Sequence, residues 1–159
     1  MTRVVLVPGA LALLPEYAGL HDPVRHLRAA CLSAVAWLGR DVEVLADEQG
    51  ARVGAYLLDA TTRSVDEASY LVVANGSARR TEKAPGHLDE RSFAFDDGLR
   101  EWLSGRGSPP DPALGEELLA SMTGFALMAE RVPPWGAPVI DFDDDPFGVQ
   151  YWVLRWQVR

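Results

Sequence analysis

The side chains best suited to chemistry lie together in one polar loop, residues 74–89. The loop follows the apolar run 70–73, which is typical of a buried strand, and open α/β sheets bind ligands at the carboxyl ends of their strands. Arginine binds a carboxylate or phosphate through paired N–H groups, and lysine offers a point charge. Lys83 is the only lysine in a chain rich in arginine. The pattern therefore predicts a binding site for a small anionic or aromatic ligand. Its candidate ligand-binding residues are Asn75, Ser77, Arg79, Arg80, Lys83 and His87.

The same loop also has a plainer interpretation, in which its charges are solvated and pair with Glu82, Asp89 and Glu90. His87 is the one candidate for catalysis, because the unperturbed pKa of histidine lies near neutral pH. It fits equally well as an exposed residue before the start of the next helix. The sequence is compatible with both interpretations of the loop.

Four aspartates crowd a second short segment near the C-terminus. They are Asp141, Asp143, Asp144 and Asp145. Oxygen-rich clusters bind Mg²⁺ or Ca²⁺, so this segment is an alternative metal site. It lacks the spaced glycine and the downstream glutamate of a calcium loop, and an aspartate before Pro146 is typical of a turn. His21 and His26 are five residues apart, whereas ligands that share a helical face are three or four apart. We therefore expect no metal cofactor.

The composition is that of an ordinary globular protein. A length of 159 residues suits one domain, 1–159, and 48% of the residues are hydrophobic. The net charge of −8 disfavours nucleic acid and anionic lipid as partners. A single cysteine, Cys31, rules out an internal disulfide, and the apolar run 4–14 is too short to span a membrane. We expect a cytoplasmic protein.

Strand and helix patterns alternate along the chain, which is typical of an α/β protein. The predicted strands are residues 3–8, 42–45, 70–74, 139–142 and 148–158. The predicted helices are residues 23–38, 51–60, 90–103 and 112 to about 129. The last two strands are joined by a short acidic turn and must pair antiparallel. These patterns predict a three-layer αβα sandwich with a central mixed sheet and a C-terminal antiparallel hairpin. Both faces of the last strand are apolar, which predicts either core packing or contact with another subunit, in a homo-oligomer or with a partner chain.

Three stretches of the chain, residues 5–16, 75–89 and 144–151, together resemble the class III extradiol ring-cleavage dioxygenase B-subunit superfamily. Residues 5–16 look like the first strand of that family and the loop after it. Residues 75–89, with Phe95 and Asp96 in the next helix, are similar to a loop of actinobacterial members known only as subunit-B-like, and residues 144–151 are similar to their closing hairpin. The resemblance runs in order along the whole chain and implies the same three-layer fold, in a shorter version. Active members hold a non-haem iron(II) with two histidines and a glutamate, and a further histidine acts as acid and base.

Other residues occupy the positions that carry this chemistry in the family. Gly9 stands in place of the first metal histidine, and residues 46–49 contain no histidine where the second is expected. Arg79 falls about where the acid/base histidine belongs, and Glu130 is the only candidate for the glutamate. The resemblance therefore implies a protein of this fold without ring-cleavage activity. Two alternatives stay open: an active metal-dependent oxygenase that binds iron(II) through relocated ligands, and a non-catalytic interaction subunit of a larger complex.

Overall fold

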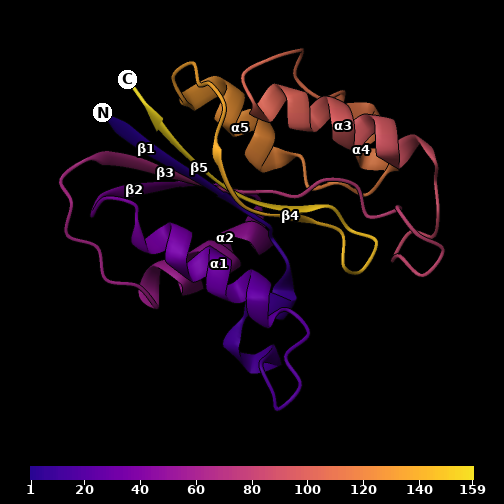
Figure 1. Cartoon of the computed structure of the whole chain (residues 1–159), viewed down its shortest axis with the longest axis horizontal. Coiled ribbons are helices and arrows are strands. Elements are labelled where there is room, and N and C mark those ends of the chain that lie inside the picture. Colours follow the sequence, from indigo (N-terminus) through magenta and orange to yellow (C-terminus); the bar gives the residue numbers. More distant parts are fainter.

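The five strands form one mixed sheet in the order β2-β3-β1-β5-β4, as seen in the computed structural model, which describes residues 1–159 (Figure 1). The strands are β1 (Thr2–Val7), β2 (Val42–Leu45), β3 (Ala68–Val73), β4 (Val139–Asp144) and β5 (Tyr151–Val158). Strands β1, β2 and β3 run parallel, whereas β5 pairs antiparallel with both β1 and β4. The predicted mixed sheet and its C-terminal antiparallel pair are confirmed.

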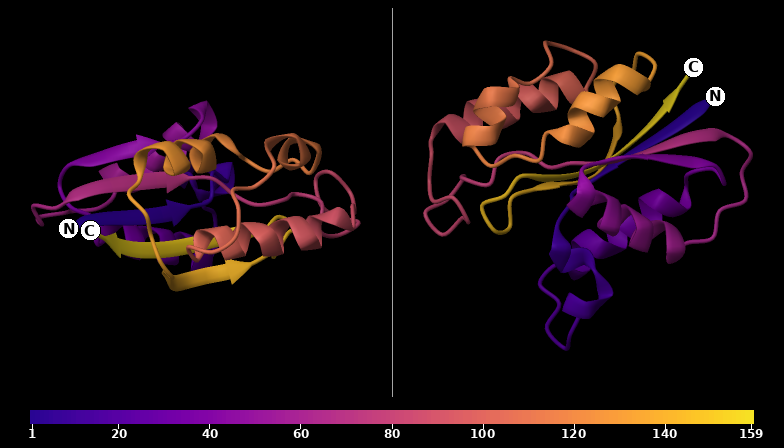
Figure 2. Two further views of the ribbon diagram at one scale, coloured as in Figure 1. Left: turned by 90° about the horizontal axis from the view of Figure 1, so that it is seen from above. Right: turned by 180° about the vertical axis from the view of Figure 1, so that it is seen from behind.

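Helices cover both faces of this sheet (Figures 1 and 2). On one face lie α1 (Arg25–Ala36) and α2 (Glu48–Asp59), and on the other lie α3 (Arg91–Leu103), α4 (Pro112–Glu117) and α5 (Thr123–Arg131). Two short 3₁₀ turns, η1 (Leu11–Leu13) and η2 (Pro15–Tyr17), follow β1. The three-layer arrangement is therefore as predicted. None of the helices combines the length and the hydropathy that a membrane crossing requires.

The chain forms two helices, α4 and α5, where the sequence predicts one from residue 112 to about 129. Asp111 caps α4 as predicted, because its carboxylate accepts a hydrogen bond from a backbone N–H of the first turn (3.0 Å). The helix ends just before Leu119, whose backbone adopts the left-handed conformation (φ 58°). The chain then returns to the sheet, where Ser121 forms an isolated β-bridge with Asn75. The apolar residues keep their helical spacing through this break, so the sequence pattern predicts one continuous helix.

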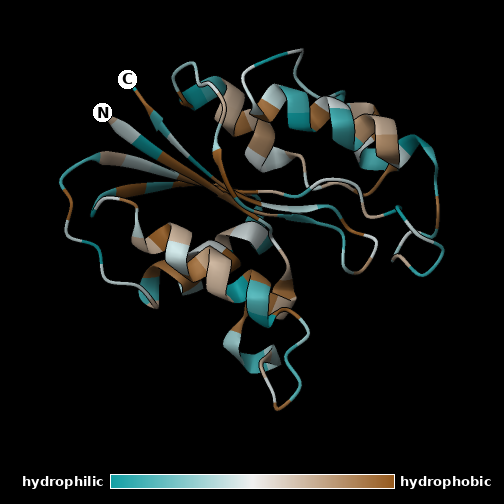
Figure 3. Cartoon of the chain, in the orientation of Figure 1, coloured by the Kyte–Doolittle hydropathy of each residue, from teal (hydrophilic) through white to brown (hydrophobic).

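Two apolar cores fill the space between the sheet and the helix layers. Residues Val4–Val7 of β1 are fully buried, as expected for a continuous β-branched run covered on both faces. Alternate residues of β5 enter different cores: Tyr151 and Val153 face α1 and α2, whereas Trp152 and Leu154 face α3 and α5. The middle of the sheet is accordingly brown, the colour of hydrophobic residues, in Figure 3. Both apolar faces of β5 are thus covered within the chain, so core packing accounts for them without a second subunit.

Strand β4 forms one edge of the sheet and is largely exposed. Its side chains Val139 and Ile140 have exposed fractions of 53% and 60%. A bulge interrupts its pairing with β5 between Ile140 and Phe142. Bulges and charged side chains are common at sheet edges, because they hinder the addition of a further strand. The sheet therefore ends in an irregular, acidic strand.

Candidate functional site

The loop that follows β3 is fixed between two other segments by backbone hydrogen bonds. The N–H of Gly76 donates to the carbonyl of Gln150 (2.9 Å), and the N–H of Gln150 donates back to the carbonyl of Ser77 (2.9 Å). The N–H of Arg80 donates to the carbonyl of Gly148 (3.1 Å). On its other side, a backbone N–H of the loop donates a hydrogen bond to a backbone carbonyl in the connection between α4 and α5 (2.9 Å). The loop is therefore an ordered part of the fold at the carboxyl end of β3.

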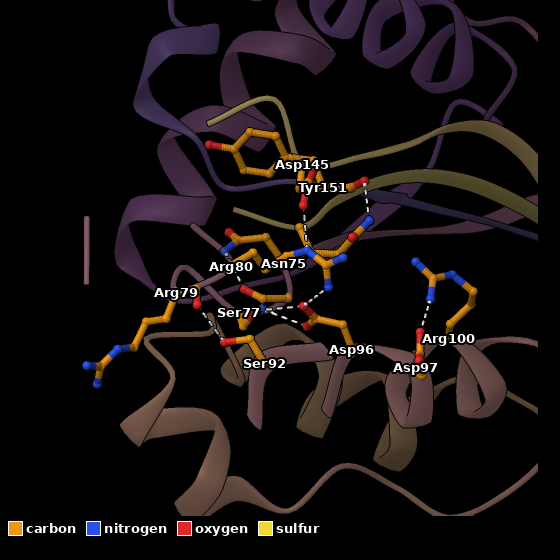
Figure 4. A network of polar contacts seen from close by, with 12 residues as sticks. Asn75, Ser77, Arg79, Arg80, Ser92, Asp96, Asp97, Arg100, Asp145 and Tyr151 are labelled. Atoms are coloured by element: carbon orange, nitrogen blue, oxygen red, sulfur yellow. Dashed lines mark hydrogen bonds and ion pairs between the residues drawn. The ribbon is translucent and has the colours of Figure 1, made fainter. Parts of the chain in front are cut away.

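A fully buried carboxylate, Asp96 of α3, lies beneath this loop (Figure 4). It accepts hydrogen bonds from the backbone N–H of Ser77 (2.9 Å), the Ser77 hydroxyl (2.6 Å) and a guanidinium N–H of Arg80 (2.9 Å). Burial raises the pKa of Asp96, and the bonds from Ser77 and Arg80 offset part of that rise. Gly76 allows the close approach, since a Cβ there would lie 2.6 Å from the Asp96 Oδ1. Asp96 thus ties the loop to α3.

Arg80 is held between two carboxylates and does not extend into solvent. Its Nε donates to Asp145 (2.6 Å) while Nη1 donates to Asp96, and the exposed fraction of its side chain is only 16%. The guanidinium also stacks over the ring of Phe93, 4.7 Å from its centroid. Burial alone would lower the pKa of Arg80, but the two carboxylates outweigh it and keep the side chain charged. Arg80 therefore anchors the loop and has little free charge for a ligand.

Arg79 and His87 point away from this network. Figure 4 shows the Arg79 side chain directed outward, and its guanidinium donates to the carbonyls of His87 (3.4 Å) and Glu117 (3.1 Å). His87 has a left-handed backbone (φ 60°), and its exposed ring lies with Nδ1 3.1 Å from the carbonyl oxygen of Glu82. The two guanidinium groups are thus engaged with different partners, Arg79 with two backbone carbonyls and Arg80 with two carboxylates. The ligand-binding roles of these residues, and of Asn75 and Ser77, stay predictions.

Asp89 precedes α3 and binds the first residue of that helix, Arg91. Its Oδ1 accepts from the backbone N–H of Arg91 (3.0 Å), and the Arg91 guanidinium donates to Oδ2 (2.8 Å). The side-chain and backbone hydrogen bonds from Arg91 lower the pKa of Asp89 to about 2. This pKa lies below the ordinary value of 3.8, so the ionised Asp89 carboxylate stabilises the folded protein. Its contribution to folding stability is complete above pH 3.8 and is lost as the pH falls from 3.8 towards 2.

We expect an NMR titration of the Asp89 carboxyl carbon to have its midpoint near pH 2. In the Arg91→Ala variant the midpoint should move towards the ordinary value of 3.8, because that variant loses the guanidinium. An identical midpoint in the two proteins would contradict the assignment of the shift to Arg91.

An open cavity of about 480 Å³ lies between the loop and the turn that joins β4 to β5. It is lined by Thr81, Glu82, Lys83, Asp145, Pro146, Phe147 and Gly148. The ammonium of Lys83 makes no ion pair, and the ring of Phe147 has an exposed fraction of 42%. Sequence reasoning missed Phe147, because no pattern indicates that this turn faces residues 81–83. We call this space the Lys83 cavity.

The four C-terminal aspartates each have a separate hydrogen-bond or ion-pair partner in the structure. Asp141 pairs with Arg155 (2.7 Å), Asp143 with Arg100 (3.0 Å) and Asp145 with Arg80 (2.6 Å). The remaining carboxylate, Asp144, accepts a bond from the next backbone N–H (2.8 Å). No three histidine, cysteine, aspartate or glutamate side chains gather anywhere in a metal-binding arrangement. Successive side chains of β4 point to opposite faces of the sheet, and three of the four aspartates pair with different arginines. These aspartates are therefore close in the sequence but do not form one cluster in space.

Gly9 and Asp47, which lie in the stretches that the resemblance aligns with iron ligands, are engaged in hydrogen bonds within the fold. The carbonyl of Gly9 accepts a hydrogen bond from the side chain of Gln49 (2.8 Å), and the residue offers no ligand side chain. Asp47 caps α2, since its Oδ1 accepts from the N–H of Gly50 (2.7 Å), and its Oδ2 accepts from the hydroxyl of Ser121 (3.3 Å). Of the two carboxylates in this segment, Asp47 is thus engaged in capping α2, and Glu48 is exposed in the first turn of that helix.

No protein-family model matches the chain, and no curated protein sequence matches it. The resemblance to the extradiol dioxygenase B subunit thus stays a prediction, and function has to be argued from the site itself.

Proposed function

We propose that this protein is a non-catalytic member of the extradiol dioxygenase B-subunit type that binds a small aromatic carboxylate in the Lys83 cavity. The observation that carries the proposal is the presence, in one cavity of about 480 Å³, of an ammonium without an ion-pair partner and an exposed phenyl ring. A cavity of this size suits a small molecule, and its position near the carboxyl end of β3 is the usual one in open α/β sheets.

The charges around the cavity favour a ligand with a single negative charge. Lys83 supplies the attraction, and the hydroxyl of Thr81 adds a hydrogen-bond partner. The carboxylate of Asp145 also lines the cavity, but it is engaged by Arg80 (2.6 Å), which leaves Lys83 as the one lining cation and without an ion-pair partner. Glu82 and the net charge of −8 would repel a polyanion such as a nucleotide. The ring of Phe147 provides an apolar wall on which an aromatic ring can stack.

Titration with benzoate, followed by NMR of the ligand signals, tests the proposal. We expect a dissociation constant on the order of 1 mM for the unmodified protein and about tenfold weaker binding for Lys83→Ala, because a charge-assisted contact is lost. Phe147→Ala should weaken binding as well. The matched control is Arg25→Ala, which removes one exposed positive charge from α1, far along the chain from the cavity.

Equal binding by Lys83→Ala and the unmodified protein would refute the assigned site. The non-catalytic half of the proposal has its own readout: after anaerobic incubation with iron(II) and desalting, the protein should retain no iron. Retention of about one iron per chain would favour the active oxygenase instead.

A further inference from the structure

A second cavity, of about 290 Å³, lies among α3, α5 and the segment that leads from α3 into α4. Trp102 of α3 and Phe125 of α5 form two of its walls, and Met122 borders it at the start of α5. The remaining wall comes from Pro109 and Pro110, in the segment between α3 and α4, and from Pro112, the first residue of α4. No charged side chain lines this space, which we call the proline-lined cavity.

The walls of this cavity are held in place without a ligand. The Trp102 ring makes edge-to-face contacts with Phe125 (centroids 6.1 Å apart) and with Trp135 (5.1 Å). The indole N–H of Trp135 donates to the carbonyl of Trp102 (3.1 Å), which fixes the pair. Proline has a restricted backbone, so the opposite wall loses little conformational freedom when a ligand binds. The cavity is therefore preorganised.

We propose that the proline-lined cavity binds a neutral aromatic molecule of one or two rings. Its volume lies at the lower end of ligand cavities, which selects a compact ligand, and the absence of lining charges disfavours an ion, since no partner would replace its hydration. Two aromatic walls offer edge-to-face contacts to a further ring. This site shares no residue with the Lys83 cavity and takes a ligand of different charge.

Two alanines on α5, Ala126 and Ala129, line the cavity and are themselves exposed, so larger side chains at these positions fill the space without disturbing the core. Leucine is also a good helix former. The test is a titration of the full chain with fluorobenzene, observed by ¹⁹F NMR, for the unmodified protein, Ala126→Leu and Ala129→Leu. The matched control is Ala55→Leu, which adds the same side chain to an exposed position of α2 on the other face of the sheet.

We expect saturable binding with a dissociation constant of about 1 mM, at least tenfold weaker binding in one or both α5 variants, and no change in the control. Circular dichroism and the melting temperature of each variant show that it is folded. Failure of the unmodified protein to bind fluorobenzene would overturn the proposal. Undiminished binding by both folded α5 variants would also overturn it, because the probe would then occupy another place. Benzoate binding at the Lys83 cavity is measured separately, so the failure of one proposal leaves the other intact.

Discussion

Replacement of Trp152 by alanine is expected to lower the free energy of unfolding by about 4 kcal/mol, because large-to-small changes of buried aromatic residues leave a cavity. Trp152 is the largest fully buried side chain of the protein. It lies on β5 within the core that α3 and α5 cover, and the guanidinium of Arg100 stacks near its ring (5.5 Å). A Cβ on Gly76 would lie 3.1 Å from the ring, so the same side chain also supports the loop after β3.

Urea denaturation measures this loss, and two further variants define its cause. Trp37, on the other face of the sheet, is only partly buried, so Trp37→Ala is the matched control and should lose much less. The indole N–H of Trp152 is buried and forms no well-aligned hydrogen bond, although it lies near enough to Asp143 to help lower the pKa of that carboxyl. Trp152→Phe should therefore recover most of the stability, because it keeps an aromatic ring and removes a poorly satisfied donor. Equal losses in Trp152→Phe and Trp152→Ala would contradict this account.

The second large effect is expected at Asp96. The Asp96→Ala variant should be destabilised by about 3 kcal/mol, because removal of one partner of a buried ion pair leaves the other partner without compensation. Here the change leaves the backbone N–H of Ser77 without its acceptor and deprives Arg80 of one of its two carboxylates. Arg80 keeps Asp145, which places the loss at the lower end of the range for buried pairs.

The neighbouring residue offers a control for this change as well. Asp97 lies next to Asp96 on α3, but its side chain is 74% exposed and contacts only Arg100, three residues away (2.8 Å). Asp97→Ala should change the unfolding free energy by less than about 0.5 kcal/mol. In Asp96→Asn an oxygen acceptor for Ser77 is retained, and the loss should be about half that of Asp96→Ala. Similar urea midpoints for Asp96→Ala and Asp97→Ala would show that the buried network does not stabilise the loop.

Local patterns were sufficient to predict most of the fold. The β-branched runs predicted five strands close to their observed positions, and the Asp111-Pro112 start of α4 followed from capping chemistry. The break between α4 and α5 was not predictable, because Leu119 is an ordinary helix residue by type and adopts the left-handed conformation in its tertiary context.

The candidate site was less predictable, because its contacts join residues far apart in the sequence. By its position in the sequence, Arg80 is a candidate ligand-binding side chain. The sequence does not reveal its partner Asp145, which is 65 positions further along the chain. Asp96 reads as a surface acid on an amphipathic helix, yet it is fully buried. Lys83 has no ion-pair partner in the structure, a point on which the sequence left two interpretations open. The proline-lined cavity has no sequence signal at all, because three helices are needed to close it.

The form of strand β4 has a consequence for how the protein behaves in concentrated solution. A strand from another chain that approached this edge would meet the carboxylates of Asp141, Asp143 and Asp144 on a backbone distorted by a bulge. The regular ladder that seeds fibrils requires a straight, unpaired edge of low charge; the outer side of β4 is unpaired, but its backbone is bent by the bulge and most of its length is acidic. Two of the three carboxylates are also paired with Arg155 and Arg100, so the edge is charged yet does not repel the body of its own protein. The chain thus carries its own protection against amyloid-like growth at the strand that is most exposed to it.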